Sequence, residues 1–467
     1  MSRDYPLRVA VVGSGPSGFY AAGFLLSHGE RPVEVDMLER LPTPWGLVRS
    51  GVAPDHARIK SVTRIFEKTA QHPAFRFFGG VEVGVDVTPK DLLDRYHAVV
   101  YAVGTPTDNR LGVPGDGRAG SVAATEFVAW YNGHPSHADA AFDLSCERAM
   151  VVGNGNVAID VARMLVLDPD ELAGTDTADH AIAAFAAASV TDVVILGRRG
   201  PAQAAFTNPE LRELGEQARA DVIVDPAELE LDPASAAWLE SDAASPTARR
   251  NMAMLRDFAA RRPAGRSHRV ELRFCRSPVE VLGDGDDGPV TGLRVARNRL
   301  EPDALGGVRA VATGEHAVIP CGLVIRSIGH RGRPLPGVPF DERRGLIRNE
   351  GGRVCEEDGT PRVGEYAVGW IKRGPSGVIG TNKKCAADTV AGLLDDLASG
   401  RLPDPQTGYG DAIDAWLRSR VAELVTWGGW EAIDAHERAR GAPAGRPRVK
   451  VVRVPEMLAV AAHGRGT

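Results

Sequence analysis

Residues 9–18 read VAVVGSGPSG, and this stretch decides the fold. Its first four residues are apolar and mostly β-branched, a pattern typical of a buried parallel strand. Gly13, Gly15 and Gly18 follow with the G-x-G-x-x-G spacing, and a helical pattern continues to residue 26. In this motif the first glycine allows a tight turn, the second lets a pyrophosphate approach the backbone, and the third packs helix against strand. Since the N-terminus of the helix also attracts phosphate, the stretch predicts a dinucleotide site.

A second strand is expected over residues 33–38, and it ends at Glu39. An acidic residue about 20 positions beyond the glycines accepts hydrogen bonds from ribose hydroxyls. A glycine-rich turn alone would be weak evidence for a nucleotide site. The order strand, glycines, helix, strand and acid favours a nucleotide site over a structural turn.

The same order of elements returns near residue 149. A strand over 149–152 leads into the turn Gly153-Asn154-Gly155-Asn156-Val157, and a helix and a further strand are expected over 159–167 and 193–196. Where the first unit has Glu39, this unit has Arg198 and Arg199. Guanidinium groups do not accept hydrogen bonds from ribose hydroxyls, but they bind a 2′-phosphate through charge-assisted bonds. The sequence therefore predicts FAD in the first unit and NADPH in the second.

The composition limits the classes of function. A chain of 467 residues is expected to form two or three domains, and 43% hydrophobic with 25% charged residues is ordinary for a globular protein. The net charge of −6 argues against a nucleic-acid partner. Neither a leader nor a membrane-spanning run is expected, because the first strand begins by Leu7 and no apolar run is long enough. The five scattered cysteines predict a cytoplasmic protein with reduced thiols.

Two further stretches have an unusual composition. Residues 42–56 contain three prolines and two glycines among apolar residues, which predicts an irregular loop held against the nucleotide. Residues 366–383 form a short strand and a glycine-rich segment before a helix expected over 386–397. Free N–H groups in that segment would face the carbonyl edge of a flavin, and the helix dipole would favour its anionic reduced ring.

Several other segments complete the expected order. A helix is expected over 59–69 and strands over 75–83 and 97–103, and a similar strand at 322–330 marks where the chain re-enters its first domain. The tail from residue 411 carries three tryptophans and is expected to pack on the first domain. No metal site is predicted, because the Asp-rich turn after residue 283 lacks the spaced ligands of a calcium loop.

With these motifs in place, the chain resembles the adrenodoxin reductase family of NADPH–ferredoxin reductases, particularly its bacterial members, over nearly its whole length. Five stretches carry the resemblance: VGSGPSG at 12–18, PWGLVR at 44–49 with GVAPDH at 51–56, VGNGNV at 152–157, GRRGP at 197–201 with AFT at 205–207, and GWIKRGPSGVI at 369–379. The resemblance implies an α/β protein with two Rossmann-like dinucleotide-binding domains. The NADP-binding domain, 109–324, would be inserted into an FAD-binding domain made of 1–108 and 325–467.

The resemblance also implies a set of binding residues. Those for FAD, besides Gly13, Gly15, Gly18 and Glu39, are Ser17, Leu47 and Val83, with Trp370, Gly377, Val378 and Ile379 at the isoalloxazine. Those for NADP are Arg110, Asn154, Gly155, Asn156, Val157, Arg198, Arg199, Glu210 and Gly377. The pair Asn208-Pro209 before Glu210 departs from the family pattern.

The expected activity is electron transfer from NADPH through FAD to a ferredoxin that feeds an oxygenase, such as a cytochrome P450, or another ferredoxin-dependent enzyme. His56 and Glu210 are the catalytic candidates, expected to meet at the nicotinamide and to position it. The ferredoxin is expected to be acidic and to meet a local basic patch, for which the candidates are Lys372, Arg373, Lys383, Lys384 and Arg212. The chain itself is expected to be a monomer or weak dimer.

Two other functions stay open at this point. Another flavoenzyme class is possible, but a disulfide reductase needs a redox-active cysteine pair, which the sequence lacks, and a monooxygenase needs a substrate pocket. A non-catalytic protein that senses NADPH would not need the flavin-facing glycine-rich segment. Mixing the protein with NADPH separates these alternatives, because a sensor would leave the flavin oxidised and a monooxygenase would consume oxygen coupled to one organic substrate.

Overall fold

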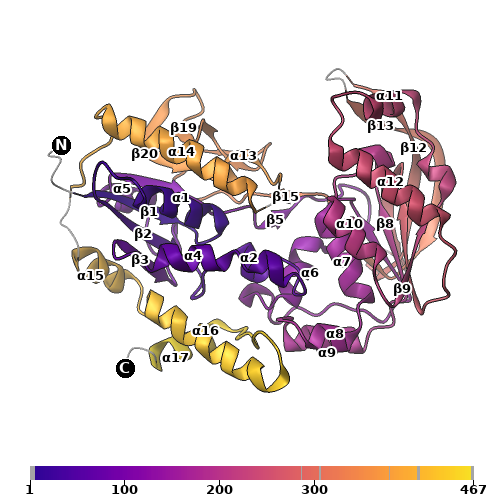
Figure 1. The fold of residues 1–467 in the computed structure, drawn as a ribbon, viewed down its shortest axis with the longest axis horizontal. Helices are drawn as coiled ribbons and strands as arrows, with labels where there is room; N and C mark the ends of the chain where they lie inside the picture. The colour runs from indigo at the N-terminus through magenta and orange to yellow at the C-terminus, as the bar shows by residue number, and fades with distance from the viewer. Residues whose placement is uncertain (1–5, 286, 304–306, 378, 407–410, 464–467) are drawn as a thin grey trace. The chain divides into compact units, whose positions relative to one another are not determined.

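The computed structural model describes residues 6–285, 287–303, 307–377, 379–406 and 411–463 (Figure 1). The chain forms two compact units. The first unit consists of Met1–Thr107, Asn132–Ala138 and His330–Thr467, and the second of Asp108–Tyr131 and Asp139–Gly329. The return to the first unit comes after strand β14 (Leu323–Arg326), later than the boundary at 324/325 expected from the sequence, because β14 pairs on both sides within the second unit.

A mostly parallel sheet organises the first unit, with the order β18-β19-β20-β4-β1-β2-β3. The glycine motif follows β1, which is buried along its length and pairs in parallel with β2 and β4. The antiparallel strands β18 and β19 lie at one edge. The strands are β1 (Leu7–Val12), β2 (Val33–Glu39), β3 (Phe75–Gly79), β4 (Ala98–Tyr101), β18 (Asn349–Glu350), β19 (Arg353–Cys355) and β20 (Pro361–Ala367).

Helices complete the first unit (Figure 1). They are α1 (Pro16–Leu26), α2 (Leu47–Ser50), α3 (Ala57–Lys60), α4 (Thr63–Ala70), α5 (Pro89–Leu93), α13 (Trp370–Arg373), α14 (Thr381–Ala398), α15 (Asp411–Arg420), α16 (Trp427–Gly441) and α17 (Val454–His463). Residues from α1, α14 and α16 share one apolar core with alternate residues of β1. The prediction that the tail packs on the first domain is confirmed, since Trp430 is buried in that core.

Two local predictions for the first unit are wrong. The 42–56 loop contains one regular turn, α2, which begins after Gly46 in the left-handed region, with a φ of 49°, and ends at Gly51. The single helix expected over 59–69 is divided into α3 and α4 around Ser61 and Val62. In the loop, the prolines and glycines predicted irregular backbone, and in the helix, the apolar spacing predicted one continuous element. Tertiary packing decides the local backbone in both places.

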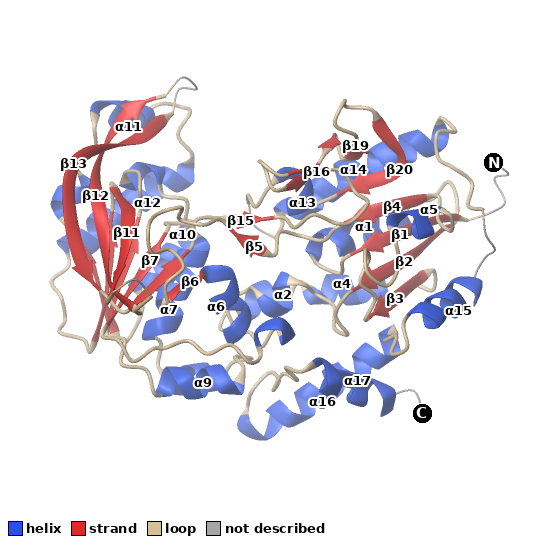
Figure 2. Ribbon diagram, turned by 180° about the vertical axis from the view of Figure 1, so that it is seen from behind, coloured by secondary structure: helices blue, strands red, loops and turns tan. Residues whose placement is uncertain are grey.

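The second unit has a parallel sheet with the order β6-β14-β7-β8-β10-β9 and a separate antiparallel sheet, β11-β12-β13 (Figure 2). The parallel strands are β6 (Ser121–Ala123), β7 (Arg148–Val152), β8 (Asp192–Leu196), β9 (Ala220–Val224), β10 (His268–Arg273) and β14. The antiparallel strands are β11 (Arg276–Gly283), β12 (Val290–Pro302) and β13 (Val308–Pro320). The helices are α6 (Ala124–Tyr131), α7 (Asn156–Val166), α8 (Pro169–Ala173), α9 (Asp179–Ala186), α10 (Asn208–Gly215), α11 (Pro233–Glu240) and α12 (Pro246–Ala260).

The two parallel sheets place their glycine-rich strands in the same way. β1 lies between β4 and β2, and β7 lies between β14 and β8. In each sheet the chain reverses its direction of growth at this strand, and open α/β sheets bind ligands at the carboxyl end of such a switch point. The predicted fold class, with two Rossmann-like units and one inserted into the other, is confirmed. Among the described residues, no helix has the length and apolar character to span a membrane.

Candidate dinucleotide sites

The glycine turn of the first unit leaves space at one position only. Gly13 has a φ of 101°, and a Cβ there would lie 2.6 Å from the Ala102 carbonyl oxygen. A Cβ on Gly18 would lie 2.2 Å from the Gly13 carbonyl oxygen. A Cβ on Gly15 meets nothing within 4 Å, and Gly15 is the N-cap of α1 without a side-chain cap. The turn therefore offers open space and uncapped N–H groups, which fit a pyrophosphate.

Glu39 is fixed at the end of β2 by donors from the same turn. The backbone N–H and the hydroxyl of Ser14 donate to its Oε2 over 3.0 and 2.7 Å. The Leu41 N–H donates to its Oε1 over 3.1 Å. A carboxylate has about four acceptor positions, so these three bonds orient Glu39 and leave capacity for a ribose hydroxyl.

The 42–56 loop packs directly on the glycine turn. The Trp45 N–H donates to the Ser14 carbonyl over 3.1 Å, and a Cβ on Gly46 would lie 2.9 Å from the Gly15 Cα. Leu47, which opens α2, is 41% exposed. His56 is buried at the N-cap of α3, and its backbone N–H donates to the Ala53 carbonyl. Val83, in contrast, lies buried in the apolar core on the other face of the sheet.

The glycine-rich segment after β20 meets the same helix end. A Cβ on Gly369 would lie 2.0 Å from the Ser17 Oγ, so only glycine fits there. The Trp370 Nε1 is buried without a hydrogen-bond partner among the described residues. A buried donor of this kind fits a ligand acceptor, such as a carbonyl of the isoalloxazine. Gly377 has a φ of 75°, Ile379 is half-buried, and Val378 lies outside the described residues.

The second unit repeats the first turn. Gly153 has a φ of 129° and a Cβ there would lie 2.0 Å from the Ser327 carbonyl oxygen, whereas a Cβ on Gly155 meets nothing within 4 Å. The Asn154 carbonyl accepts from Ala205 N–H over 3.0 Å. The Asn156 Oδ1 accepts from Thr207 N–H over 2.8 Å. The two asparagines thus tie the turn to the segment before α10, while Val157 lies half-buried in the first turn of α7.

The turn after β8 carries Arg198 and Arg199, and hydrogen bonds hold its backbone in place. Arg198 is exposed and Arg199 half-buried. The Arg198 carbonyl accepts from the Asn298 Nδ2 over 2.8 Å, and the Arg199 carbonyl accepts from the Cys275 N–H over 3.0 Å. Burial and the neighbouring Arg198 charge lower the pKa of Arg199. The negative charge of a bound phosphate would offset the repulsion between the two guanidinium groups and raise the pKa of Arg199 again, so the turn fits a 2′-phosphate.

Sequence reasoning missed the residue that holds this turn. Asn298 stands in β12, beside the bulge between Ala296 and Asn298, and its side chain also contacts Ser277. Its only signal in the sequence is a polar residue in a long strand, which does not point to a partner a hundred positions earlier.

Glu210 lies buried in the first turn of α10, where it accepts a hydrogen bond from the Thr207 hydroxyl. Pro209 occupies the first turn as well, where a proline is favourable, so the departure Asn208-Pro209 is compatible with the helix. Arg110 is exposed at the start of the second unit. His56 belongs to the first unit and Glu210 to the second, so their meeting at the nicotinamide stays a prediction.

Comparison with known proteins gives consistent results. Residues 7–181 match the model of the family described as pyridine nucleotide-disulphide oxidoreductase. The chain is 49% identical to NADPH-ferredoxin reductase FprA of Mycobacterium tuberculosis, over 97% of this chain and 99% of FprA. It is 43% identical to the mitochondrial NADPH:adrenodoxin oxidoreductase of Salvelinus fontinalis, over 97% of this chain and 91% of that protein. The solved structure of Mycobacterium tuberculosis FprA in complex with NADPH superimposes with a TM-score of 0.92, over 98% of this chain and 100% of that chain.

Proposed function

This chain belongs to the adrenodoxin reductase-type family of NADPH–ferredoxin reductases, and from this membership we propose that it passes electrons from NADPH through FAD to a ferredoxin. The observation that carries the proposal is the contrast between two otherwise equivalent turns. One is completed by a carboxylate, Glu39, and the other by two guanidinium groups, Arg198 and Arg199. One chain thus combines a site for ribose hydroxyls with a site for a 2′-phosphate.

The FAD domain is assigned to the first unit and the NADP domain to the second. In the first unit, the turn at Gly15 receives the pyrophosphate and Glu39 binds the ribose, while Trp370 donates its orphaned N–H at the flavin. FAD held by these residues would supply hydride acceptance and one-electron donation, while the protein supplies position and electrostatics.

The second unit selects the coenzyme. Arg198 and Arg199 hold the 2′-phosphate, and the turn at Gly155 receives the pyrophosphate. His56 and Glu210 position the nicotinamide, since hydride transfer needs no proton at that ring and requires neither an acid nor a base. Both side chains are buried in fixed backbone settings, His56 at the N-cap of α3 and Glu210 in the first turn of α10, which supports a positioning role.

The partner is an acidic ferredoxin that meets a basic surface beside the flavin segment. Of the candidates in the first unit, Lys383 and Lys384 are exposed on α14. The Lys372 Nζ donates to the Thr389 Oγ1 over 2.8 Å, and Arg373 donates to the Asn382 Oδ1 over 2.9 Å. Lys372 and Arg373 keep their charge but are half-buried. Steering is therefore assigned first to the exposed Lys383 and Lys384, with Arg212 of the second unit as a further exposed candidate.

The remaining parts of the proposal concern the setting of the reaction. The reduced ferredoxin feeds an oxygenase, such as a cytochrome P450, or another ferredoxin-dependent enzyme. The protein acts in the cytoplasm as a monomer or weak dimer. All five cysteines are free, which supports a reducing compartment and gives no support to a disulfide reductase.

A panel of ferredoxins, assayed for NADPH-driven reduction, tests the activity. The expected result is reduction of at least one acidic ferredoxin at a rate well above that with NADH. A monooxygenase would instead consume oxygen in proportion to one organic substrate, and a sensor would reduce no ferredoxin. Either of these outcomes would contradict the proposal.

A further inference from the structure

The tail helix α16 contacts the 42–56 loop at two points. Trp430 packs edge-on against Trp45, with 6.1 Å between ring centroids. The Arg49 guanidinium lies over the Trp430 ring, 5.5 Å from its centroid. Trp427 makes a second edge-on contact with Trp45 at 5.7 Å. Helix α16 therefore contacts the loop both at Trp45, near its start, and at Arg49 in α2.

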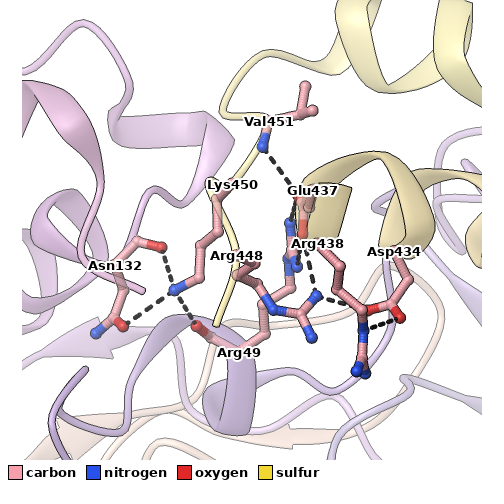
Figure 3. A network of polar contacts seen from close by, with 8 residues as sticks. All are labelled: Arg49, Asn132, Asp434, Glu437, Arg438, Arg448, Lys450 and Val451. Atoms are coloured by element: carbon pink, nitrogen blue, oxygen red, sulfur yellow. Dashed lines mark hydrogen bonds and ion pairs between the residues drawn. The ribbon is translucent and has the colours of Figure 1, made fainter. Parts of the chain in front are cut away.

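The buried carboxylate of Glu437 also binds Arg49 of the loop (Figure 3). Glu437 is 0% exposed and accepts two hydrogen bonds from the Arg49 guanidinium, the longer of 2.9 Å. It also accepts from Arg448 over 3.1 Å and from the Val451 N–H over 2.8 Å. Burial raises the pKa of Glu437, but Arg49 and Arg448 outweigh it and lower the pKa, so the carboxylate is charged.

The backbone of the same arginine is held by a second tail residue. The Lys450 Nζ donates to the Arg49 carbonyl over 3.0 Å and to the Asn132 carbonyl over 3.0 Å (Figure 3). Lys450 and Asn132 are both buried. Asn132 begins the short segment, up to Ala138, that belongs to the first unit although its flanks belong to the second. Lys450 thus joins three distant parts of the chain: the tail, the Arg49 backbone and Asn132.

The loop requires such support because its backbone is strained. Trp45 has a φ of 87°, in the left-handed region that is unfavourable for a bulky residue. A strained residue persists only when its surroundings over-determine it. The loop also touches the glycine turn directly, through the bond from Trp45 to Ser14 and the close approach of Gly46 to Gly15.

We propose that Glu437 and Lys450 are positioning residues that hold the 42–56 loop on the glycine turn, so that the tail sets the rate at which FAD leaves. The inference rests on the proposed function, since it takes the first unit as the FAD site. Both act through Arg49, which stands two residues beyond Leu47 in α2.

The test measures FAD release from the purified holoenzyme by ultrafiltration over time, with the absorbance of free flavin as the readout. The variants are Glu437→Gln, which keeps the shape and removes the charge, and Lys450→Met, which keeps the stem and removes the donor. The matched control is Asp396→Asn, because Asp396 is also buried and paired, with Arg353 at 2.7 Å, but belongs to α14 and does not contact the loop.

We expect both variants to release FAD at least about tenfold faster than the wild type, with the control close to the wild type. Excess FAD should restore the rate of flavin reduction by NADPH in both variants, which a general loss of folding would not allow. Release from Glu437→Gln and Lys450→Met that is no faster than release from Asp396→Asn would overturn the inference. If Glu437→Gln does not fold, Lys450→Met alone decides. A wild-type protein that binds no FAD would instead contradict the proposed function.

Discussion

Gly13 and Gly15 have opposite surroundings although they belong to one motif. A Cβ on Gly13 would overlap the Ala102 carbonyl in a backbone conformation with a φ of 101°, whereas a Cβ on Gly15 enters open space. We therefore expect Gly13→Ala to lower the free energy of unfolding by at least about 1–3 kcal/mol. Gly15→Ala should leave stability unchanged and weaken FAD binding at least about tenfold, because its methyl group occupies the space of the pyrophosphate.

Chemical denaturation and titration of the apoprotein with FAD measure the two effects. If both variants lose stability equally, or if Gly15→Ala binds FAD like the wild type, the open space at Gly15 is not where the pyrophosphate lies.

We predict that Arg198 and Arg199 determine the preference for NADPH over NADH. Charge-assisted bonds contribute about 1.5–3 kcal/mol each, so replacing both arginines with glutamine should raise the KM for NADPH at least about tenfold. The kcat and the use of NADH should change much less, because neither depends on the 2′-phosphate. Steady-state kinetics with both coenzymes provides the measurement.

The matched control removes two charges elsewhere in the same unit, with glutamine at the exposed Arg250 and Arg256 of α12. A double variant at 198 and 199 that keeps its preference for NADPH would show that the second site has been assigned wrongly.

His56 and Glu210 are predicted to position the nicotinamide. His56→Gln and Glu210→Ala should fold with FAD bound and should reduce it more slowly with NADPH, since a displacement of about 1 Å costs roughly a hundredfold in rate. Binding of NADP⁺ should change little. Rapid mixing with NADPH, followed at the flavin absorbance, gives the rate. The exposed His316 of β13, changed to glutamine, is the control, and rates equal to the wild type at both positions would leave the pair with a structural role only.

At the scale of elements, the exposed start of α14 is the surface assigned to the ferredoxin. Replacing Lys383 and Lys384 with glutamine should slow ferredoxin reduction at least about threefold at low salt, because steering depends on a local positive field. The difference should vanish at high salt, where charges are screened. Reduction of a small neutral acceptor should be unaffected throughout.

The control variant carries glutamine at Lys68 and Lys90, which are exposed on α4 and α5 of the same unit. An equal loss in the control, or the same salt dependence for the ferredoxin and the neutral acceptor, would remove α14 from the docking surface.

The sequence was most informative where local chemistry alone determines an element. β1 and β7 were predicted because buried apolar runs end in spaced glycines, and the surroundings of Gly13 and Gly153 show why no other residue fits. α2 was missed because its single turn depends on Gly46 at a φ of 49° and on the tail, which lies far away in sequence. β13 was missed as well, since most of its residues are exposed and give no alternating apolar pattern.

The site shows the same limit. Residues proposed to contact a nucleotide follow motifs, so Glu39, Arg198 and Arg199 could be predicted from the sequence. Residues that hold those motifs in place follow no motif of their own. Asn298 binds the Arg198 carbonyl and Glu437 binds Arg49, and both partners are far away in sequence. No local spacing of residues predicts either contact.

At the scale of the whole molecule, the chain divides into two units, and each contains one glycine-rich turn proposed to bind a nucleotide. The division into units depends on tertiary contacts, as the short segment Asn132–Ala138 illustrates. It belongs to the first unit, where the Lys450 Nζ donates to the Asn132 carbonyl, and no sequence pattern predicts that bond. The proposed assignment of FAD to the first unit and NADP to the second nevertheless follows from Glu39 at the end of β2 and from Arg198 and Arg199 just after β8.

The most direct test of the central claim is one anaerobic mixing experiment. The purified protein, with FAD bound, is mixed with NADPH under argon, and the flavin absorbance is followed before and after adding an oxidised ferredoxin. We predict rapid bleaching with NADPH, much slower bleaching with NADH, and return of the flavin colour as the ferredoxin is reduced. A flavin that stays oxidised with NADPH, or one that bleaches but does not pass its electrons to any ferredoxin, would contradict the account.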